Sequence, residues 1–493
     1  MVTPCVSREQ AKRLIDDEVG RPQSNKVLHA HPGPMYWHPD DGTQSERLRA
    51  RLELAQTQAF SSNLYLGIPF CIPTEPAHCG FCLFPTQDYR GNTSILEYLS
   101  YLDREADLYA PYFRYDHLAS IYVGGGTPNL LRAEEYHRLM AIAEKLYRDI
   151  PGDIEKTVEG IPQLFTREKV QAIKEAGFNR VSMGVQQMSD ELIKYSGRRQ
   201  THKQVIDALD SFNEAKLAAN VDLIYGWPEQ TTEGMLRDLG ELVDLGVRHI
   251  THYQLNVAGK SNFSKVQRAV LPPMEAVIEM YQESQHFLKG KGFRQETVYD
   301  WERIDGIPGR FETGNAHRYQ YESNLRDPFP VEEQKVSETR NMIGLGYAAC
   351  GFPVTWPAEN GPNWCYMNSR SLETYYRQIG AGRLPIDRQF SHNKDDLKLV
   401  WVFQSSQKMA LDLDTYAVAF QSDLLADFAA IFDELESRGW IEVDTHRIRY
   451  VGLGQFHIPL IQALFSYARL AELRSSLKQG TTGGTVIPIS EVA

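Results

Sequence analysis

Short apolar runs rich in β-branched residues alternate with helix-like stretches over residues 64–257. Six of these runs are expected to form strands: Leu64–Ile68, Ile121–Val123, Thr157–Ile161, Arg180–Val185, Val221–Tyr225 and His249–Leu255. Strands that alternate with helices pair in parallel through right-handed crossovers. Near-continuous apolar strands are typical of a sheet covered on both faces. Six units are fewer than the eight of a closed barrel, so the pattern predicts an α/β fold with an open, six-stranded partial (β/α)6 barrel.

Helical periodicity fills the intervals between these runs. Apolar positions from Ile95 to Tyr109 recur on one face of a predicted helix, which Ser94 opens with Glu97 as its capping box. Further helices are predicted near residues 132–149, 166–176, 202–216, 231–246 and 272–290.

The chain divides into five predicted regions: an N-terminal lid or extension (1–60), the partial barrel (61–260), a region that completes the barrel and covers the substrate (261–385), a C-terminal helical domain (386–475) and a flexible tail (476–493). The first region is rich in histidine and proline, which predicts an irregular segment. Residues 434–443 have the pattern of a helix, a glycine cap and a strand, which predicts a winged-helix-like unit. The tail is rich in glycine and threonine.

Distinctive polar or glycine-rich residues lie in, end or follow the predicted strands. Cys71 and the turn Gly124–Pro128 follow strands, Glu159 and Gln186 end strands, and Asp222 lies in the fifth strand. Because the carboxyl ends of the strands build the active site of a β/α barrel, we expect all five to meet at one mouth.

Composition and charge narrow the function classes. The 493 residues are 42% hydrophobic and 24% charged, and the net charge is −12. This composition excludes wholesale disorder, and the acidic balance argues against non-specific nucleic-acid binding. No apolar run approaches the ~20 residues of a membrane helix. The first thirty residues carry charges where a signal peptide would be apolar. We therefore expect a cytoplasmic protein.

A cluster of three cysteines is the strongest chemical signal. Cys71, Cys79 and Cys82 lie within twelve residues, whereas Cys5 and the other two cysteines stand apart. Three soft thiolates on one loop are typical ligands of an iron–sulfur cluster, and Gly80 eases the turn between the last two. Zinc, with His78 as a fourth ligand, is the alternative.

The turn Gly124–Gly126 is a second, weaker signal. Three glycines after a strand allow a ligand to approach the backbone closely. The turn lacks the spacing of a dinucleotide-binding fingerprint, and no Gly-Lys-Ser/Thr follows it.

Four segments together identify a family. Tyr65–Cys71 with Cys79-Gly80-Phe81-Cys82, then Gly124–Pro128, Gly177–Gln186 and Asp222–Thr231, resemble the radical S-adenosylmethionine (SAM) superfamily. Within it, the chain is similar to the oxygen-independent coproporphyrinogen III oxidase (HemN-like) branch over residues 60–475, including the C-terminal domain. The resemblance implies a radical SAM partial barrel.

The resemblance also implies cofactors and the residues that hold them. A [4Fe-4S] cluster on Cys71, Cys79 and Cys82 would leave one iron open for SAM, whose one-electron cleavage gives a hydrogen-abstracting radical. By matching position, Tyr65, Gly125 and Glu159 would hold this SAM molecule. The positions that match a second SAM site are Phe81, Gly126, Thr127, Gln186, Arg198 and Asp222. No matching position identifies a further catalytic residue. Implied partners are a small-molecule substrate and a low-potential flavodoxin- or ferredoxin-type electron donor, with no nucleic acid or membrane.

Several positions depart from the porphyrin enzymes. Thr74–Ala77 looks like an insertion between the first two cysteines, and Leu83-Phe84 follow Cys82 where the oxidase has another cysteine. Asn256 replaces an alanine of the second SAM site. Residues 315–320 lack the His-Asn-x-x-Tyr-Trp stretch of related heme chaperones.

Retained second-site residues and missing porphyrin-specific ones favour one hypothesis. It is transfer of a methyl or methylene carbon, as methylation or cyclopropanation, to an sp2 carbon of a small aromatic or heteroaromatic molecule. The alternatives are coproporphyrinogen III oxidation or another tetrapyrrole step, and a heme chaperone-like function in heme binding. His317, Tyr319, Tyr36 and Trp37 are candidates to line the substrate cavity.

Overall fold

The structure is a computed structural model. It describes residues 5–19, 31–56, 60–255, 261–304, 331–332, 335–336, 339–353 and 363–480. None of the helices in these ranges is both long enough and apolar enough to cross a membrane.

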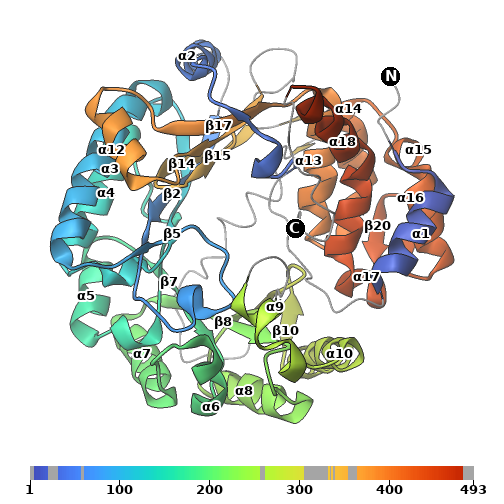
Figure 1. Ribbon diagram of the computed structural model, residues 1–493, viewed down its shortest axis with the longest axis horizontal. Helices are drawn as coiled ribbons and strands as arrows, with labels where there is room; N and C mark the ends of the chain where they lie inside the picture. Colours follow the sequence, from blue (N-terminus) through green and yellow to red (C-terminus); the bar gives the residue numbers. More distant parts are fainter. Residues whose placement is uncertain are drawn as a thin grey trace.

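The six predicted strands form the centre of the molecule (Figure 1). They are β2 (Phe60–Ile68), β5 (His117–Gly125), β6 (Glu155–Gly160), β7 (Arg180–Gln186), β8 (Ala218–Tyr225) and β9 (His249–Gln254). Each pairs in parallel with the next. The prediction of a parallel sheet of six βα units is confirmed.

Three further strands extend this sheet. β14 (Thr339–Gly346) runs parallel to β2 at one edge. At the other edge, β11 (Asp300–Arg303) and then β10 (Phe293–Gln295) pair in antiparallel orientation. The central sheet is therefore mixed and has nine strands in the part of the chain that is described.

Helices cover the outer face of the curved sheet (Figure 1). They are α3 (Asn92–Phe113), α4 (Glu135–Leu146), α5 (Arg167–Glu175), α7 (His202–Ala215), α8 (Thr232–Asp244) and α10 (Met274–Gly290). Thr201 and Gln204 form a capping box at the start of α7. The capping box predicted at Ser94 is wrong, because α3 begins two residues earlier and the Ser94 hydroxyl donates to the Gly91 carbonyl at 2.7 Å.

The N-terminal region is more regular than its composition suggested. It contains α1 (Arg8–Val19) and α2 (Gln44–Leu54), separated by the short β1 (His38–Pro39). The expectation of an irregular segment is therefore wrong for both helices. Ala11 and Ile15 are fully buried, and α1 packs on α16 and α18 of the C-terminal region (Figure 1).

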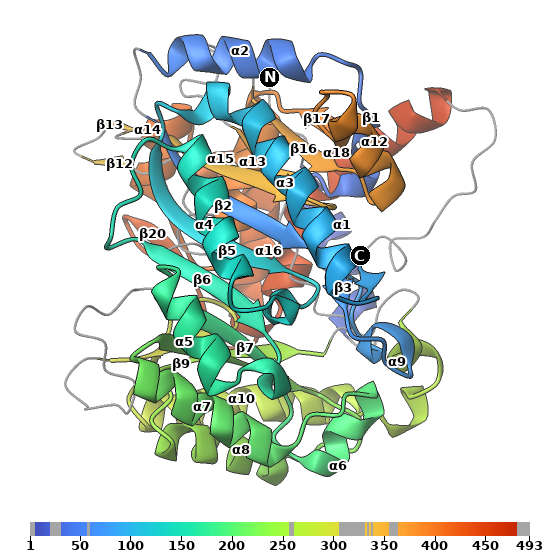
Figure 2. The same cartoon turned by 90° about the vertical axis from the view of Figure 1, so that its left-hand side faces the viewer.

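α2 lies across the top of the molecule in the view of Figure 2. Its Arg51 is fully buried and donates to both carboxylate oxygens of Asp116, which precedes β5. Asp116 also accepts from Ser62 at the start of β2. This ion pair fixes α2 at the amino end of the strands, opposite the end where the predicted site residues lie.

The C-terminal region has the predicted winged-helix-like order. Its helices are α13 (Lys394–Ser406), α14 (Leu413–Phe420), α15 (Leu424–Asp427), α16 (Ala429–Ser437), α17 (Leu453–Phe456) and α18 (Ile458–Gly480). Gly439 has φ +64° after α16, and β19 (Ile441–Val443) follows. β19 pairs with β20 (Arg447–Tyr450), which pairs with β18 (Ala410–Asp412).

A second sheet joins this region to the barrel. It has the order β1, β17 (Ile386–Ser391), β16 (Trp364–Asn368) and β15 (Cys350–Gly351). The N-terminal segment thus pairs with a strand some 350 residues further along, through His38 and Gln389. Helix α12 (Leu372–Gly380) connects β16 to β17.

The closing edge of the central sheet is held by one buried carboxyl group. Glu105 of α3 accepts hydrogen bonds from the Tyr375 hydroxyl (2.6 Å), the Asn368 amide (2.7 Å) and the Gly346 backbone N–H (2.8 Å). These donors lie on α12, β16 and β14. Burial raises the pKa of Glu105 to about 7, although the three hydrogen bonds act in the opposite direction.

This carboxyl group predicts a loss of stability as pH rises. In the unfolded chain it ionises near its ordinary pKa of 4.5, whereas in the folded protein it stays protonated until about 7. The folded state binds more protons between these values, so the free energy of unfolding should fall by up to about 3 kcal/mol across that window. Thermal unfolding of Glu105→Gln from pH 5 to 8 should show a flatter dependence than the wild type. Glu97→Gln, at an exposed site on the same helix, is the control. Parallel curves for Glu105→Gln and the wild type would contradict this assignment.

Candidate active site

The three clustered cysteines lie on one loop after β2. The loop begins at β3 (Phe70–Cys71), contains the short 3-10 turn Ala77–Cys79 and ends at β4 (Gln87–Asp88), which pairs with β3. His78, Cys79 and Gly80 have φ values of 54°, 55° and 74°. A left-handed conformation costs about 1–2 kcal/mol for a residue with a Cβ, so surrounding contacts must hold the first two.

The segment that resembles an insertion supplies such contacts. Thr74 Oγ1 accepts from the Cys79 N–H at 2.9 Å and donates to the Pro76 carbonyl at 2.8 Å. The Phe263 N–H donates to the Gly80 carbonyl at 3.1 Å. The backbone of Glu75 lies against Gly197, next to Arg198. Thr74 and Glu75 of this segment therefore brace the cysteine loop against its neighbours.

The three thiols share a partly buried environment. Burial raises the pKa of Cys71, and it raises that of Cys82 to about 11, with Cys79 and Cys71 adding to the effect on Cys82. Thr127 Oγ1 lies 3.5 Å from Cys71 Sγ, and Arg198 Nε lies 3.4 Å from Cys79 Sγ. Because metal ligands must be thiolates, metal binding here would release protons.

His78, the fourth ligand that the zinc alternative requires, is not placed with the three cysteines. The ring of His78 is exposed, and its Nδ1 lies 3.0 Å from Thr86 Oγ1. Among the described residues, no group of three or more His, Cys, Asp or Glu side chains is placed to hold a single metal ion.

The glycine turn after β5 lies in direct contact with the start of the cysteine loop. The N–H groups of Gly126 and Thr127 donate to the carbonyls of Ile68 and Phe70, both at 2.7 Å. A Cβ on Gly126 would lie 2.5 Å from the Phe70 carbonyl oxygen, so only glycine fits here. The turn therefore fixes the loop that carries Cys71 and leaves a surface without side chains.

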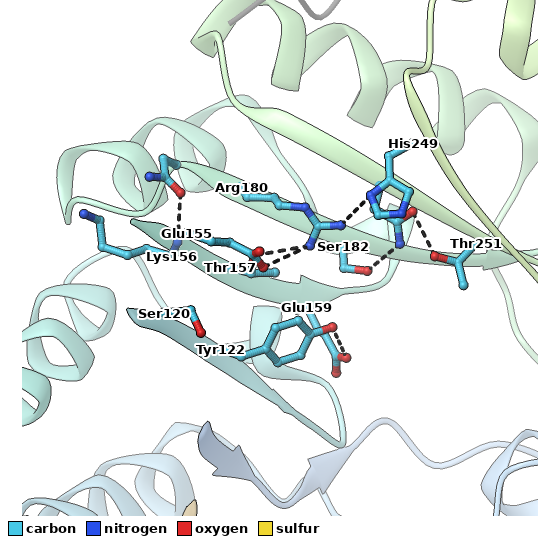
Figure 3. Close-up of polar contacts among 12 residues, drawn as sticks. Ser120, Tyr122, Glu155, Lys156, Thr157, Glu159, Arg180, Ser182, His249 and Thr251 are labelled. Atoms are coloured by element: carbon cyan, nitrogen blue, oxygen red, sulfur yellow. Dashed lines mark hydrogen bonds and ion pairs between the residues drawn. The ribbon is translucent and has the colours of Figure 1, made fainter. Parts of the chain in front are cut away.

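Glu159 at the end of β6 is oriented toward this turn. Its Oε1 accepts from the Tyr122 hydroxyl at 2.6 Å, and its Oε2 accepts from the Gly125 N–H at 3.2 Å (Figure 3). Tyr65 stacks on Tyr122 with ring centroids 6.3 Å apart. Tyr65, Gly125 and Glu159, predicted from three different strands, therefore lie together.

Four residues of the second predicted set, Phe81, Gln186, Arg198 and Asp222, lie near Gly184 of β7, whereas Gly126 and Thr127 lie in the glycine turn. Arg198 Nη1 donates to the Gly184 carbonyl at 2.7 Å, and the guanidinium lies 5.8 Å from the centre of the Phe81 ring. Gln186 has φ +69° at a register shift in β7, which turns its amide back toward Gly184. Asp222 pairs with Gly184 across the sheet. The set converges beside the first one, as the strand ends predicted.

Asp222 has an environment that raises its pKa to about 6. Burial is the main cause, and nearby Asp300 adds to it, whereas the hydrogen bond from Asn220 and the charges of Arg180 and His249 lower it. Asn220 Nδ2 donates to Asp222 Oδ1 at 2.6 Å.

Some predicted residues lie elsewhere or outside the described residues. Asn256, His317 and Tyr319 fall outside them, as does the rest of 315–320. Tyr36 and Trp37 are buried in the second sheet's core with Cys365, Met367 and Phe390, and they do not line the site.

The structure adds residues that the sequence analysis missed. These polar side chains lie on the inner face of the sheet: Arg180, Ser182, Asn220, His249, Thr251 and Asp300 (Figure 3). Their alternate spacing within otherwise apolar strands was an available signal.

Comparison with known proteins gives the family. Residues 72–242 match the Radical SAM superfamily. The heme chaperone HemW of Lactococcus lactis is 32% identical over 319 residues, which cover 63% of this chain and 75% of that protein. The chain belongs to the HemN-like branch of the radical SAM superfamily.

Other relatives extend the comparison. The oxygen-independent coproporphyrinogen III oxidase of Helicobacter pylori is 24% identical over 380 residues, covering 76% of this chain and 78% of that protein. HemW of Buchnera aphidicola is 28% identical, and the chain spans only 63% of its length. The solved coproporphyrinogen III oxidase (HemN) of Escherichia coli has the same fold, with a TM-score of 0.73, 23% identity and coverage of 89% of this chain and 96% of that one.

Radical SAM enzymes use a [4Fe-4S] cluster and SAM, and the described residues of this radical SAM protein fit that requirement. Three thiols lie on one loop, the adjoining turn excludes side chains, and an oriented carboxylate stands beside it. The cysteines would hold the cluster, and Glu159 and the Gly125 backbone would hold SAM.

Loss of any ligand cysteine should remove the cluster. Cys71→Ala, Cys79→Ala and Cys82→Ala proteins, reconstituted with iron and sulfide without oxygen, should lose most bound iron and the brown absorption, because two thiolates anchor the cluster poorly. Iron content and visible spectra are the measurements. Cys5→Ala changes a half-buried thiol in the C-terminal core and should keep full iron content. Full iron in all three ligand variants would refute the assignment.

Proposed function

We propose that this protein is a radical SAM enzyme that binds two SAM molecules and acts on a tetrapyrrole, in the manner of oxygen-independent coproporphyrinogen III oxidase. One observation carries the proposal. Both predicted sets of SAM-binding positions converge at one end of the sheet, on a fold whose named relatives either oxidise coproporphyrinogen III or handle heme. A low-potential flavodoxin- or ferredoxin-type protein would supply the electron.

The first set of residues would orient the reactive SAM. The Glu159 carboxylate is held by Tyr122 and Gly125, so its position is fixed before a ligand arrives. It suits the hydroxyl or ammonium groups of a nucleoside amino acid. When bound, the cluster and SAM supply a hydrogen-abstracting radical. The protein contributes binding, orientation and exclusion of competing partners.

The second set of residues would hold the other SAM. Arg198 presents a planar, permanently charged donor that suits a carboxylate. The Asp222 carboxylate suits hydroxyl groups or an ammonium group, and the bulge at Gln186 turns its amide toward Gly184, which Arg198 also contacts. The set therefore offers both a cation and an anion to the charged groups of an amino-acid moiety.

The proposed reaction balances at each propionate side chain that becomes a vinyl group. The carbon β to the carboxylate loses one hydrogen atom to the radical derived from SAM, the bond to the carboxyl carbon breaks, and carbon dioxide departs. One electron passes to an acceptor, and a vinyl group remains.

Transfer of a methyl or methylene carbon is the second candidate. Leu83 and Phe84 follow the last ligand and are 50% and 59% exposed, where the oxidase has another cysteine. This difference alters the surroundings of the cysteines, whereas the positions that match the second SAM site keep their residue types.

Product analysis distinguishes the candidates. The reduced holoenzyme, incubated with coproporphyrinogen III and methyl-deuterated SAM, should release carbon dioxide and yield vinyl-bearing product without deuterium. The Cys82→Ala protein, which should lack the cluster, is the control. Deuterium in a product would favour methyl transfer instead. Tight heme binding without any cleavage of SAM would contradict both enzymatic proposals and favour a heme chaperone.

The raised pKa of Asp222 predicts pH-dependent SAM binding. If the second SAM contacts the carboxylate, its affinity should fall about tenfold per pH unit below pH 6, because protonation removes the charge. Equilibrium binding of SAM to the unreduced holoenzyme from pH 5 to 8 measures this. Asp222→Asn should weaken the second site and abolish its pH dependence.

Asp238→Asn is a matched control. Burial also raises the pKa of Asp238 to about 6, but this residue lies on α8 and accepts from the Met188 N–H. A pH dependence that survives in Asp222→Asn would count against the assignment.

A further inference from the structure

A network of polar side chains runs along the inner face of the sheet beneath Asp222. It begins at the amino ends of β6 and β7, where Thr157 donates to Glu155 (2.7 Å) and Arg180 donates to Thr157 (3.3 Å). Arg180 Nη2 then donates to His249 Nδ1 at 2.9 Å (Figure 3). The side chains of Glu155, Thr157 and Arg180 are at most 2% exposed.

The network of polar side chains continues across β9 and β11. The other ring nitrogen of His249 lies 3.5 Å from Asp300 Oδ1. Thr251 Oγ1 lies 3.0 Å from both Asp300 Oδ1 and Asn220 Oδ1. The antiparallel pairing of β11 with β9 places Asp300 directly opposite Thr251. The Asp300 carboxylate thus lies one hydroxyl away from the Asn220 amide.

Asn220 joins this network of polar side chains to the site. Its Nδ2 donates to Asp222 Oδ1 at 2.6 Å and to Ser182 Oγ at 3.0 Å, and the residue is 1% exposed. The opposite orientation of the amide would direct its oxygen at a carboxylate, which only accepts hydrogen bonds when ionised. The orientation with the NH2 group toward Asp222 is therefore the favourable one.

We infer that Asn220 is a positioning residue for the second SAM site: it holds the Asp222 carboxylate ionised and pointed at the mouth of the barrel, and Thr251 and Asp300 fix its own orientation. The inference rests on the proposed function, because Asp222 is assigned to that SAM molecule there. A hydrogen bond to a charged group is worth more than a neutral one and is costly to lose when buried. Asn220 itself would not touch SAM.

Other charged groups face Asp222 and set the background for this effect. Arg180 of β7 and His249 of β9 favour the carboxylate, whereas Asp300 of β11 opposes it. The Tyr122 hydroxyl of β5 also interacts electrostatically with Asp222. Among the causes that lower the pKa of Asp222, the hydrogen bond from Asn220 is the largest, so the loss of Asn220 should raise that pKa.

Equilibrium binding of labelled SAM to the unreduced holoenzyme tests the inference. Asn220→Ala should keep one tight SAM site and weaken the other roughly tenfold or more. The pH at which the second site loses half its affinity should rise above that of the wild type, because the carboxylate has lost a donor that favours its charge. A purely structural role would not move that pH.

Asn63→Ala is the matched control. Asn63 is also 1% exposed on the inner face, where its Oδ1 accepts from Ser120 at 2.7 Å, and three strands separate its strand β2 from β8 in the sheet. It should lose stability and keep both SAM affinities and the wild-type pH profile. If Asn220→Ala does not fold, Thr251→Val, which keeps the side-chain volume and removes the bridging hydroxyl, should shift the same pH in the same direction by a smaller amount.

The outcomes separate the two proposals. A wild-type holoenzyme that binds one SAM overturns the proposed function and this inference with it. A wild type that binds two, with Asn220→Ala or Thr251→Val indistinguishable from Asn63→Ala, overturns the inference alone.

Discussion

The contact between two backbone turns is the constraint on which the rest of the site depends. The Gly126 and Thr127 N–H groups bond to carbonyls at the start of the cysteine loop, and the fit leaves no room for a side chain at Gly126. This contact ties the loop that carries the three thiols to the end of β5. Glu159 is in turn fixed by the Gly125 N–H. The cysteine loop and the Glu159 carboxylate therefore take their positions from one short turn.

Much of this arrangement was predictable because it follows from strand direction. Parallel strands bring their carboxyl ends to one edge, so residues at four separate strand ends had to lie near one another. Asp222 lies within β8, where it pairs with Gly184. Local patterns also identified the helix, glycine and strand order of the C-terminal region. The two N-terminal helices were missed because the histidine- and proline-rich stretch dominated the composition of that region. The apolar positions Ala11 and Ile15, which bury α1, are few.

What the sequence did not reveal depends on register between strands. Asn220, Thr251 and Asp300 are unremarkable polar residues until β8, β9 and β11 pair, and β11 runs antiparallel to the others. The same is true of Glu105, which becomes a joint between four elements only once β14 closes the edge of the sheet. Its partners lie more than 200 residues away in the chain.

The central claim is that three cysteines hold a cluster whose fourth iron binds SAM directly. Electron–nuclear double resonance of the reduced cluster, with SAM labelled by nitrogen-15 in the amino group and oxygen-17 in the carboxylate, tests it most directly. The account predicts hyperfine coupling of both labels to the cluster. Two controls should lack this coupling: unlabelled SAM, which tests the origin of the signal, and Glu159→Gln, which tests its dependence on SAM binding. A reduced cluster that forms fully, binds SAM and shows no coupling to either label would contradict it.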